Sequence, residues 1–333
     1  MLEDIRSGSL SEEERTTLAE LGFLVASAEE DRKEILCFLD KLNKADRIFS
    51  LQLVMNLDCN LDCGYCFEGS RKGRHYLTSG DAHAFIVFVM ENLKPGVEEL
   101  GITFYGGEPL LSKDLIASIS SEIRANAKQA GVKSTGKLIT NGTLLVPAAV
   151  EKLSHAGVRS VRITLDGPAD IHDKARPFRG GGGSFRTILK NLKEIVGMID
   201  IDLSGNFTRN NYRRFPELFE QLSDAGITPQ DIFSLQFYPV LQDAEGMVNC
   251  HFKEGCSSLN EPWIYEAEIF LREEILKRGF RRSKIIPTAC MMELTNRFIV
   301  NYYGGIYKCS GLIGREEYKV GDIASGIKNY HIS

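Results

Sequence analysis

The chain has no apolar run long enough to cross a membrane and no excess of positive charge. Its strongest apolar stretch, AFIVFVM at 84–90, falls far short of the about 20 residues that a membrane helix needs. The formal net charge of -5 argues against a nucleic-acid partner, because nucleic-acid footprints are basic. The opening MLEDIRSG is acidic and polar, unlike a secretory signal. We therefore expect a cytoplasmic protein with neither a membrane nor a nucleic-acid partner.

Cysteine is scarce as well, and its placement is uneven. Only 8 of 333 residues are cysteine, yet Cys59, Cys63 and Cys66 fall within one short stretch. Disulfides are rare in the cytoplasm, so clustered cysteines there more often bind metal or take part in catalysis. This stretch is therefore the first candidate site.

Strand-like and helix-like segments alternate from residue 49 onward. A β-rich run precedes a helical pattern six times, and several of these patterns end at glycine, as helix C-termini often do. Six such units imply a parallel sheet with right-handed crossovers. Because six is two short of an eightfold barrel, we expect an α/β fold with a partial (β/α)6 barrel. The predicted strands are 49–55, 101–105, 137–140, 161–165, 201–207 and 233–240; the predicted helices are 79–93, 112–131, 146–157, 184–197, 213–226 and 261–279.

Unusual residues follow the predicted strands one after another. The cysteines come after the first strand, and the carboxyl ends of parallel strands form the ligand-binding face of such folds. One active site is therefore expected there, with the cysteines at its centre. The later strand tips carry GGEP (106–109), NGT (141–143), DGPADIHDKARPF (166–178) and TRNN (208–211).

The spacing C-x3-C-x2-C provides three thiolates where a closed structural metal site needs four protein ligands. Thiolates suit zinc or iron–sulfur clusters, and three of them leave one position open for an exogenous ligand. One alternative is a zinc site completed by a distant cysteine or by His75. Another is a non-catalytic iron–sulfur or zinc protein that transfers electrons.

Together with GGEP, this spacing resembles radical S-adenosylmethionine (SAM) enzymes over about residues 49–240. The resemblance implies that Cys59, Cys63 and Cys66 hold a [4Fe-4S] cluster, with SAM on the fourth iron. It further implies that Glu108 pairs with the methionine ammonium while two glycines let the backbone lie against the methionine. Arg176 is a candidate for the methionine carboxylate, because its guanidinium can bind both oxygens. The implied cofactor contacts are Gly106, Gly107, Glu108, Pro109, Asn141, Thr164, Asp166 and Arg176.

Four further cysteines lie downstream. The segment from Cys290 to Cys309 resembles the start of a SPASM or twitch extension, which holds auxiliary [4Fe-4S] clusters. With Cys250 and Cys256 these cysteines would supply four thiolates for one such cluster; alternatively, Cys250 and Cys256 are free loop thiols. The later cysteine-dense segment of a full SPASM domain is absent, so either one cluster is held here or the intact enzyme is longer.

These features predict three regions. Residues 1–48 form a helical segment, part of a peptide-docking module, with Ile35, Phe38, Leu39 and Leu42 on one face of the helix over 28–45. Residues 49–245 form the radical SAM barrel, and residues 246–333 form an incomplete SPASM/twitch-like region.

By resemblance to geopeptide-type maturases, we expect an oxidoreductase that modifies a ribosomally synthesised peptide by Cys thioether crosslinking. The expected partners are a small precursor peptide and a one-electron reductant such as a flavodoxin or ferredoxin. The alternative is formylglycine formation like that of anaerobic sulfatase maturases. Those enzymes carry Asp at the position of Ser310, which disfavours this alternative.

Overall fold

The computed structural model describes residues 10–20, 24–25, 27–66, 68–241, 254–282 and 289–328. Within them, strands form one sheet in the order β10-β9-β8-β7-β1-β2-β3-β4-β5-β6. Neighbours from β1 to β6 pair in parallel, as predicted. The strands are β1 (Ile48–Val54), β2 (Glu99–Tyr105), β3 (Lys133–Thr140), β4 (Val158–Thr164), β5 (Asp200–Phe207), β6 (Ser234–Pro239), β7 (Arg297–Val300), β8 (Gly305–Tyr307), β9 (Gly321–Asp322) and β10 (Gly326–Ile327).

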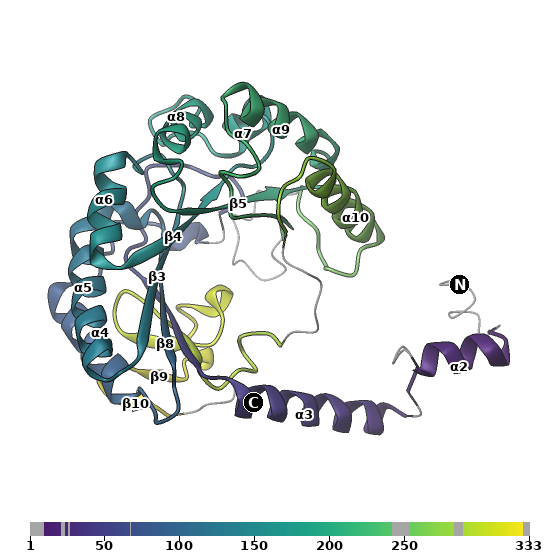
Figure 1. Ribbon diagram of the computed structural model, residues 1–333, viewed down its shortest axis with the longest axis horizontal. Helices are drawn as coiled ribbons and strands as arrows, with labels where there is room; N and C mark the ends of the chain where they lie inside the picture. The colour runs from purple at the N-terminus through teal and green to yellow at the C-terminus, as the bar shows by residue number, and fades with distance from the viewer. Residues whose placement is uncertain are drawn as a thin grey trace.

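Helices alternate with the first six strands and lie in an arc outside them (Figure 1). Glycines follow the helices where the sequence predicted helix ends. Gly131, Gly157, Gly226 and Gly279 all have the positive φ that is typical of glycine after a helix C-terminus. The short helix α7 lies in the segment after the fourth predicted strand, where no helix was predicted, and strands β7 to β10 were not predicted either. The helices are α2 (Glu12–Glu20), α3 (Ala28–Ala45), α4 (Ser79–Glu91), α5 (Lys113–Gln129), α6 (Pro147–Ala156), α7 (Ala169–Ala175), α8 (Phe185–Ile195), α9 (Phe215–Asp224) and α10 (Pro262–Lys277).

The sheet is open. In the described part of the chain β6 pairs only with β5, whereas β1 lies between β2 and β7. Strand β7 runs parallel to β1, and the hairpin-like strands β8, β9 and β10 then continue this edge in antiparallel pairs. The α/β class and the large parallel sheet are thus confirmed, whereas the strands that the structure describes do not close into a barrel.

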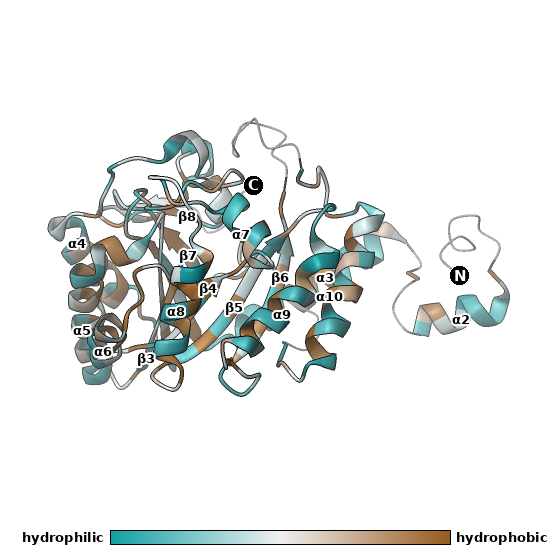
Figure 2. Cartoon of the chain, turned by 90° about the horizontal axis from the view of Figure 1, so that it is seen from above, coloured by the Kyte–Doolittle hydropathy of each residue, from teal (hydrophilic) through white to brown (hydrophobic). Residues whose placement is uncertain are grey.

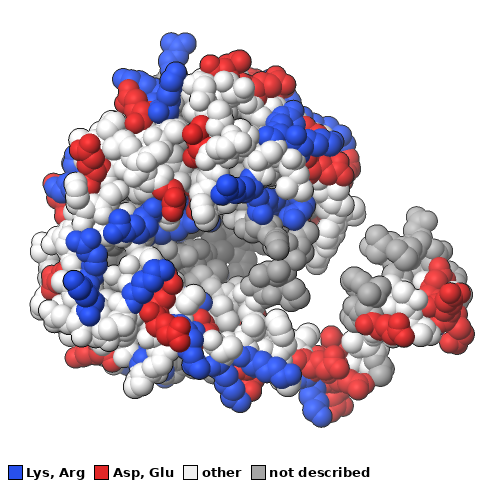
Figure 3. Space-filling view, in the orientation of Figure 1, with Lys and Arg blue, Asp and Glu red and all other residues white. Residues whose placement is uncertain are grey.

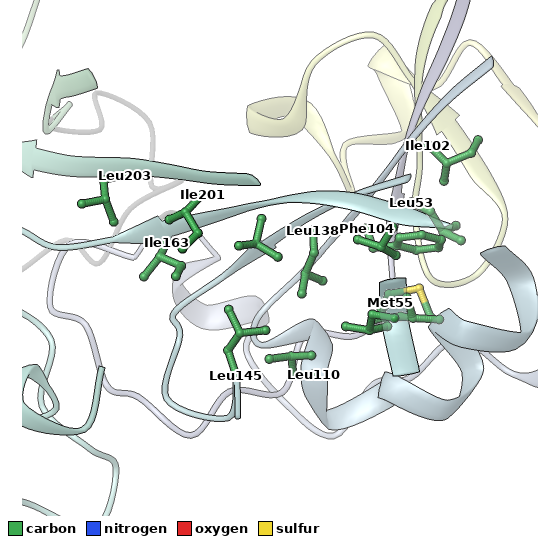
Figure 4. Packing of buried hydrophobic residues seen from close by; sticks show 14 of the residues in the cluster. Leu53, Met55, Ile102, Phe104, Leu110, Leu138, Leu145, Ile163, Ile201 and Leu203 are labelled. Carbon is green, nitrogen blue, oxygen red and sulfur yellow. The ribbon is translucent and has the colours of Figure 1, made fainter. Parts of the chain in front are cut away.

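The main core lies between the outer face of the sheet and the helices. Leu53, Phe104 and Leu138 sit side by side on neighbouring strands and are fully buried (Figure 4). Burying each such side chain is worth about 1.5–3 kcal/mol. The helices contribute matching apolar sides, visible as brown against teal in Figure 2. Helix packing against this one face therefore holds the strands in register.

The inner face of the same strands is polar. Gln52, Thr103 and Lys137 are neighbours across β1, β2 and β3, and all three are partly exposed. Lys137 forms an ion pair with Asp202 on β5. Parallel sheets covered on both faces are usually apolar throughout, so this alternation fits a sheet whose outer face alone is covered by the helices that the structure describes.

The N-terminal helices extend away from the sheet (Figures 1 and 2). Ser27 caps α3 by accepting a hydrogen bond from Glu30 N, and α3 spans the predicted residues. No residue of α3 is buried, and Ile35 and Phe38 on its predicted apolar face are 48% and 39% exposed. None of the described helices is long and apolar enough to span a membrane.

Candidate active site

The three clustered cysteines lie on the loop that follows β1, where neighbouring strand tips hold them. Cys59 Sγ accepts hydrogen bonds from Leu61 N at 3.4 Å and from Asn141 Nδ2 at 3.8 Å. Asn141 Nδ2 also donates to Asn60 Oδ1 at 2.8 Å, which ties the loop to the tip of β3. Burial raises the pKa of Cys59 to about 11 and also raises that of Cys63. Binding a metal would therefore release protons from these thiols.

Gly106 and Gly107, at the end of β2, press against the backbone of the cysteine loop. Gly107 N donates to Asn56 O at 2.9 Å, and Gly106 has a φ of +145°. A Cβ on Gly106 would lie 2.3 Å from Asn56 O, and one on Gly107 would lie 2.3 Å from Asp58 O. Only glycine fits this close approach. The glycines thus position the cysteine loop, in addition to lining the cavity beside it.

Glu108 is fully buried, and protein donors occupy its carboxylate. Its oxygens accept hydrogen bonds from Leu110 N at 3.0 Å, Thr140 Oγ1 at 2.7 Å and Asn141 N at 2.8 Å. Burial raises the pKa of Glu108, an effect that these hydrogen bonds oppose. The neighbouring Pro109 is also buried. In this structure the Glu108 side chain joins the tips of β2 and β3.

The tips of β4 and β5 meet the cysteine loop at Tyr65. The Tyr65 hydroxyl donates to Asp166 and accepts from Arg176 Nη1 at 2.6 Å and from Asn206 Nδ2 at 3.1 Å. Asp166 also accepts from Asn206 N at 2.7 Å. Thr164 lies nearby on β4, with its hydroxyl 3.3 Å from Ser204 Oγ. The structure thus places Asp166 and Arg176, both predicted, in one buried network.

A buried histidine supports this network from α7. Asp166 N donates to His172 Nδ1 at 3.1 Å, so the neutral ring carries its proton on Nε2 and donates to Ser184 Oγ at 3.0 Å. Ser184 in turn donates to Arg176 O at 2.7 Å. Burial, with the nearby Arg176 charge, holds the pKa of His172 well below its usual range. These three hydrogen bonds therefore link the backbone at Asp166, through the side chains of His172 and Ser184, to the backbone at Arg176.

Two cavities adjoin at this end of the sheet. The first, about 190 Å³, is lined by the three cysteines and by Glu68, Gly106, Gly107, Asn141, Thr164 and Arg176. The second, about 640 Å³, is lined by Asp170, Lys174, Thr208, Asn210, Asn211, Arg214 and Glu254, among others. Tyr65 and Asn206 line both cavities and form the boundary between them.

Some residues that line these cavities carry buried polar atoms without protein partners. The Nε of Arg176, the hydroxyl of Thr208 and both carboxylate oxygens of Glu68 have no hydrogen-bond partner. His172 and Thr208 lie in the strand-tip segments 166–178 and 208–211 that the sequence placed at this site, although neither was given a role. Glu68 and Asn206 were not predicted as site residues, and only their tertiary placement identifies them.

The downstream cysteines are not gathered in the described residues. Cys256 is buried beside β6, with its thiol donating to Val240 O at 3.3 Å. Cys290 is exposed and Cys309 is half-buried, while Cys250 lies outside the described residues. No three Cys, His, Asp or Glu side chains that the structure describes converge on a point where a single metal ion would bind.

The sequence matches the model of the Radical SAM superfamily over residues 53–222, just over half of the 333-residue chain. The chain therefore belongs to the radical SAM superfamily. The probable GTP 3',8-cyclase of Saccharolobus islandicus (strain M.14.25 / Kamchatka #1) is 26% identical over 78% of this chain and 77% of the relative. The AdoMet-dependent heme synthase of Methanosarcina barkeri (strain Fusaro / DSM 804) is 32% identical over 58% of this chain and 52% of the relative.

Solved structures share the fold. The enzyme anSMEcpe with bound AdoMet superposes with a TM-score of 0.65 at 19% identity, covering 83% of this chain and 78% of that chain. Streptococcus suis SuiB bound to S-adenosylmethionine gives a TM-score of 0.57 at 15% identity, covering 92% of this chain and 72% of that chain.

Family membership implies a [4Fe-4S] cluster and SAM, and the residues present fit them. Cys59, Cys63 and Cys66 line one cavity and would hold the cluster, whose irons take one thiolate each. Arg176 lines the same cavity, and its guanidinium suits a carboxylate there. When bound, the cluster and SAM supply a 5′-deoxyadenosyl radical that removes a hydrogen atom from an unactivated carbon.

Proposed function

We propose that this protein is a radical SAM maturase that modifies a ribosomally synthesised peptide, forming a thioether between a cysteine and a carbon atom. In this proposal residues 1–48 contribute to peptide docking and residues 49–245 form a partial barrel around the radical chemistry. Residues 246–333 form the SPASM/twitch-like region, with Cys290, Cys309 and the cysteines at 250 and 256 as candidate ligands of an auxiliary [4Fe-4S] cluster.

The observation that carries the proposal is the composition of the larger cavity. Asn206, Thr208, Asn210 and Asn211 line it, and an amide side chain offers the same donor and acceptor as a peptide group. The Thr208 side chain is 4% exposed and its hydroxyl has no partner. An extended peptide backbone could satisfy that hydroxyl. The cavity meets the cysteine cavity at Tyr65 and Asn206, next to the reacting centre.

The charges of this cavity disfavour a polyanionic substrate such as a nucleoside triphosphate. Its described lining carries two cations and two carboxylates, and Arg214 is already bonded to Asp170 at 2.7 Å and to Glu217 at 2.6 Å. Phosphate sites gather several free Arg or Lys donors. Figure 3 shows positive and negative side chains interspersed around a central hollow, with no broad basic surface on that face.

Two proteins that share the fold give further support. One solved structure is anSMEcpe with bound AdoMet and the Cp18Cys peptide, with a TM-score of 0.66 at 20% identity. Another is SuiB bound to its precursor peptide SuiA, with a TM-score of 0.57 at 14% identity. The same architecture thus accommodates peptides in those proteins, and we extend that use to this chain.

The proposed reaction balances as an oxidation that removes two hydrogens. With the cluster and SAM held at Cys59, Cys63 and Cys66, a reductant of the flavodoxin or ferredoxin class would supply the one electron that SAM cleavage needs. The chemistry supplied there would remove one hydrogen atom from the substrate carbon, giving methionine and 5′-deoxyadenosine. The substrate thiol would lose its proton to solvent as the carbon–sulfur bond forms, and an auxiliary cluster would be the acceptor of the remaining electron.

The test is anaerobic reconstitution with iron and sulfide, followed by reaction with SAM, dithionite and a candidate precursor peptide. We expect release of 5′-deoxyadenosine and a peptide lighter by about two hydrogen atoms. Cys63→Ala should abolish both, whereas Cys37→Ala, at an exposed position on α3, should retain release of 5′-deoxyadenosine.

Other outcomes would replace the proposal. An aldehyde in the product, trapped by a hydrazine, would indicate formylglycine formation. Bound zinc alone, or iron without release of 5′-deoxyadenosine, would indicate a non-catalytic metal protein. An unchanged peptide mass in the presence of active SAM cleavage would exclude that peptide as a substrate.

A further inference from the structure

A hydrogen bond from the tip of β3 reaches the sulfur of the first clustered cysteine. Asn141 Nδ2 donates to Cys59 Sγ over 3.8 Å. The Asn141 side chain is 4% exposed, so little water competes for this contact. Because an N–H directed at a cysteine sulfur stabilises negative charge there, the electrostatic effect depends on which end of the amide faces Cys59.

A closed ring of three polar side chains determines that orientation. Thr143 donates to Asn141 Oδ1 twice, from its backbone N at 2.9 Å and from its hydroxyl at 2.6 Å. Asn60 Nδ2 donates to the same hydroxyl at 2.8 Å, and Asn60 Oδ1 accepts from Asn141 Nδ2, also at 2.8 Å. A backbone N can only donate, so the oxygen of the Asn141 amide must face Thr143. The N–H groups of that amide are therefore held toward Asn60 and Cys59.

The backbone of the same segment is held from two sides. Asn141 N donates to Glu108 Oε2 at 2.8 Å, at the tip of β2. Asn191, buried on α8, donates from Nδ2 to Gly142 O and to Thr143 O, each at 2.9 Å. The Asn141 amide is thus fixed in position as well as in orientation. A dipole fixed in this way does not have to reorganise when a neighbouring sulfur changes charge.

We propose that the Asn141 amide raises the reduction potential of the cluster that the three clustered cysteines would hold, by donating its N–H to Cys59 Sγ. Reduction adds negative charge that is shared with the cysteine sulfurs, and an N–H dipole directed at one of them stabilises the reduced state. Asn60 and Thr143 act by positioning that amide. This inference rests on the radical SAM chemistry of the proposed function and is independent of the identity of the substrate.

The test measures the midpoint potential of the reconstituted cluster by anaerobic redox titration, followed by electron paramagnetic resonance without SAM or peptide. The proteins are the wild type, Asn141→Ala, Asn141→Ser and Asn191→Ala. Asn191→Ala is the matched control, because it removes a buried amide that holds the same segment through backbone oxygens rather than through a sulfur. Iron content and the free energy of unfolding are recorded for each protein.

We expect loss of the Asn141 amide to lower the ratio of reduced to oxidised cluster about 3- to 10-fold at a fixed potential, the effect of one hydrogen bond. For a one-electron couple this corresponds to a midpoint potential lower by about 28 to 59 mV. Asn141→Ser should behave like Asn141→Ala, because its side chain is one bond shorter than that of asparagine. Asn191→Ala should unfold more easily and yet keep the wild-type potential.

A second measurement on the wild type requires no variant to fold. Protein that contains asparagine labelled with ¹⁵N in the side-chain amide should show a ¹⁵N coupling to the reduced cluster in pulsed electron paramagnetic resonance. Asn141→Ser, prepared with the same label, should lose that coupling.

Three results would overturn the assignment. An unchanged potential in both Asn141 variants at full iron content would show that the amide does not act on the sulfur. The same fall in Asn191→Ala would assign the effect to displacement of the segment. Absence of the ¹⁵N coupling in the wild type would exclude the contact even if the Asn141 variants fail to fold. A wild type that binds iron without forming a reducible cluster would instead contradict the proposed function itself, so the two failures are distinguishable.

Discussion

Gly106 and Gly107 are as much a part of the radical site as the cysteines, because they hold the cysteine loop against β2. The atoms nearest to their missing Cβ positions are backbone atoms of residues 56–58, which cannot move without shifting the loop. Gly106 also has a positive φ that other residues rarely adopt. Replacing either glycine should therefore both destabilise the fold and weaken cluster binding, because it displaces the loop that carries the cysteines.

We expect Gly106→Ala to lower the free energy of unfolding by roughly 2–4 kcal/mol, from backbone strain and overpacking. The control is Gly131→Ala, where φ is +72° but no atom lies within 4 Å of the added Cβ. Its cost should be about 1 kcal/mol. Denaturant unfolding of both variants measures the difference, and equal losses would show that the loop accommodates a methyl group.

At the scale of elements, the short helix α7 links the tip of β4 to the start of α8. This helix carries His172, which is fully buried. In its neutral form, His172 accepts a hydrogen bond from Asp166 N and donates one to Ser184 Oγ. Protonation would convert Nδ1 from an acceptor to a donor facing the Asp166 N–H. The local structure therefore depends on an unprotonated histidine.

This dependence predicts how stability varies with pH. Because the pKa of His172 is lowered in the folded state, its contribution is present above the ordinary value of 6.5 and is lost as the pH falls below it. The free energy of unfolding of the wild type should therefore fall, relative to His172→Gln, as the pH is lowered through 6.5. Denaturant unfolding of both proteins between pH 5 and 8, the range in which histidine ordinarily titrates, measures this difference in the free energy of unfolding.

His83→Gln, at an exposed position on α4, is the control and should follow the wild-type curve. Parallel curves for the wild type and His172→Gln would show that burial of the ring does not control its charge in solution.

At the scale of the whole molecule, the described helices leave the polar inner face of the sheet uncovered, and under the proposed function this face gives room for a substrate beside the cofactor. The larger cavity and the cysteine cavity share only a boundary, so substrate binding and SAM cleavage should respond separately to mutation. Thr208 tests this, because it lines the larger cavity only.

Thr208→Val keeps the shape of the side chain and removes the unpartnered hydroxyl. Peptide modification should fall about 3- to 10-fold in kcat/KM, the effect of one lost hydrogen bond, while SAM cleavage without peptide stays unchanged. The free energy of unfolding should stay the same or rise, because no internal hydrogen bond is lost.

Thr143→Val is the matched contrast, since the Thr143 hydroxyl donates to Asn141 Oδ1 at 2.6 Å. That variant should be destabilised by about 1 kcal/mol or more. A similar loss of stability in Thr208→Val would mean that its hydroxyl is bonded within the protein.

The local pattern of the sequence was sufficient to predict the six-strand parallel order, the helices that alternate with it and the loop that carries the cysteines. These follow from short-range physics: period-2 and period-3.6 apolar patterns, glycine stops, and the fact that carboxyl ends of parallel strands meet at one edge. The motif residues could be placed at that edge because each directly follows a strand. The family model over residues 53–222 covers most of the same region.

The tertiary structure alone decided which side chains have partners and which do not. Asn206 joins Tyr65 across 141 positions of sequence, Glu108 proves to be occupied by protein donors, and Glu68 proves to be buried without them. Strand β7 joins β1 although more than 240 residues separate them along the chain. Burial and pairing at such separations depend on the packing of the complete sheet, which no local pattern encodes.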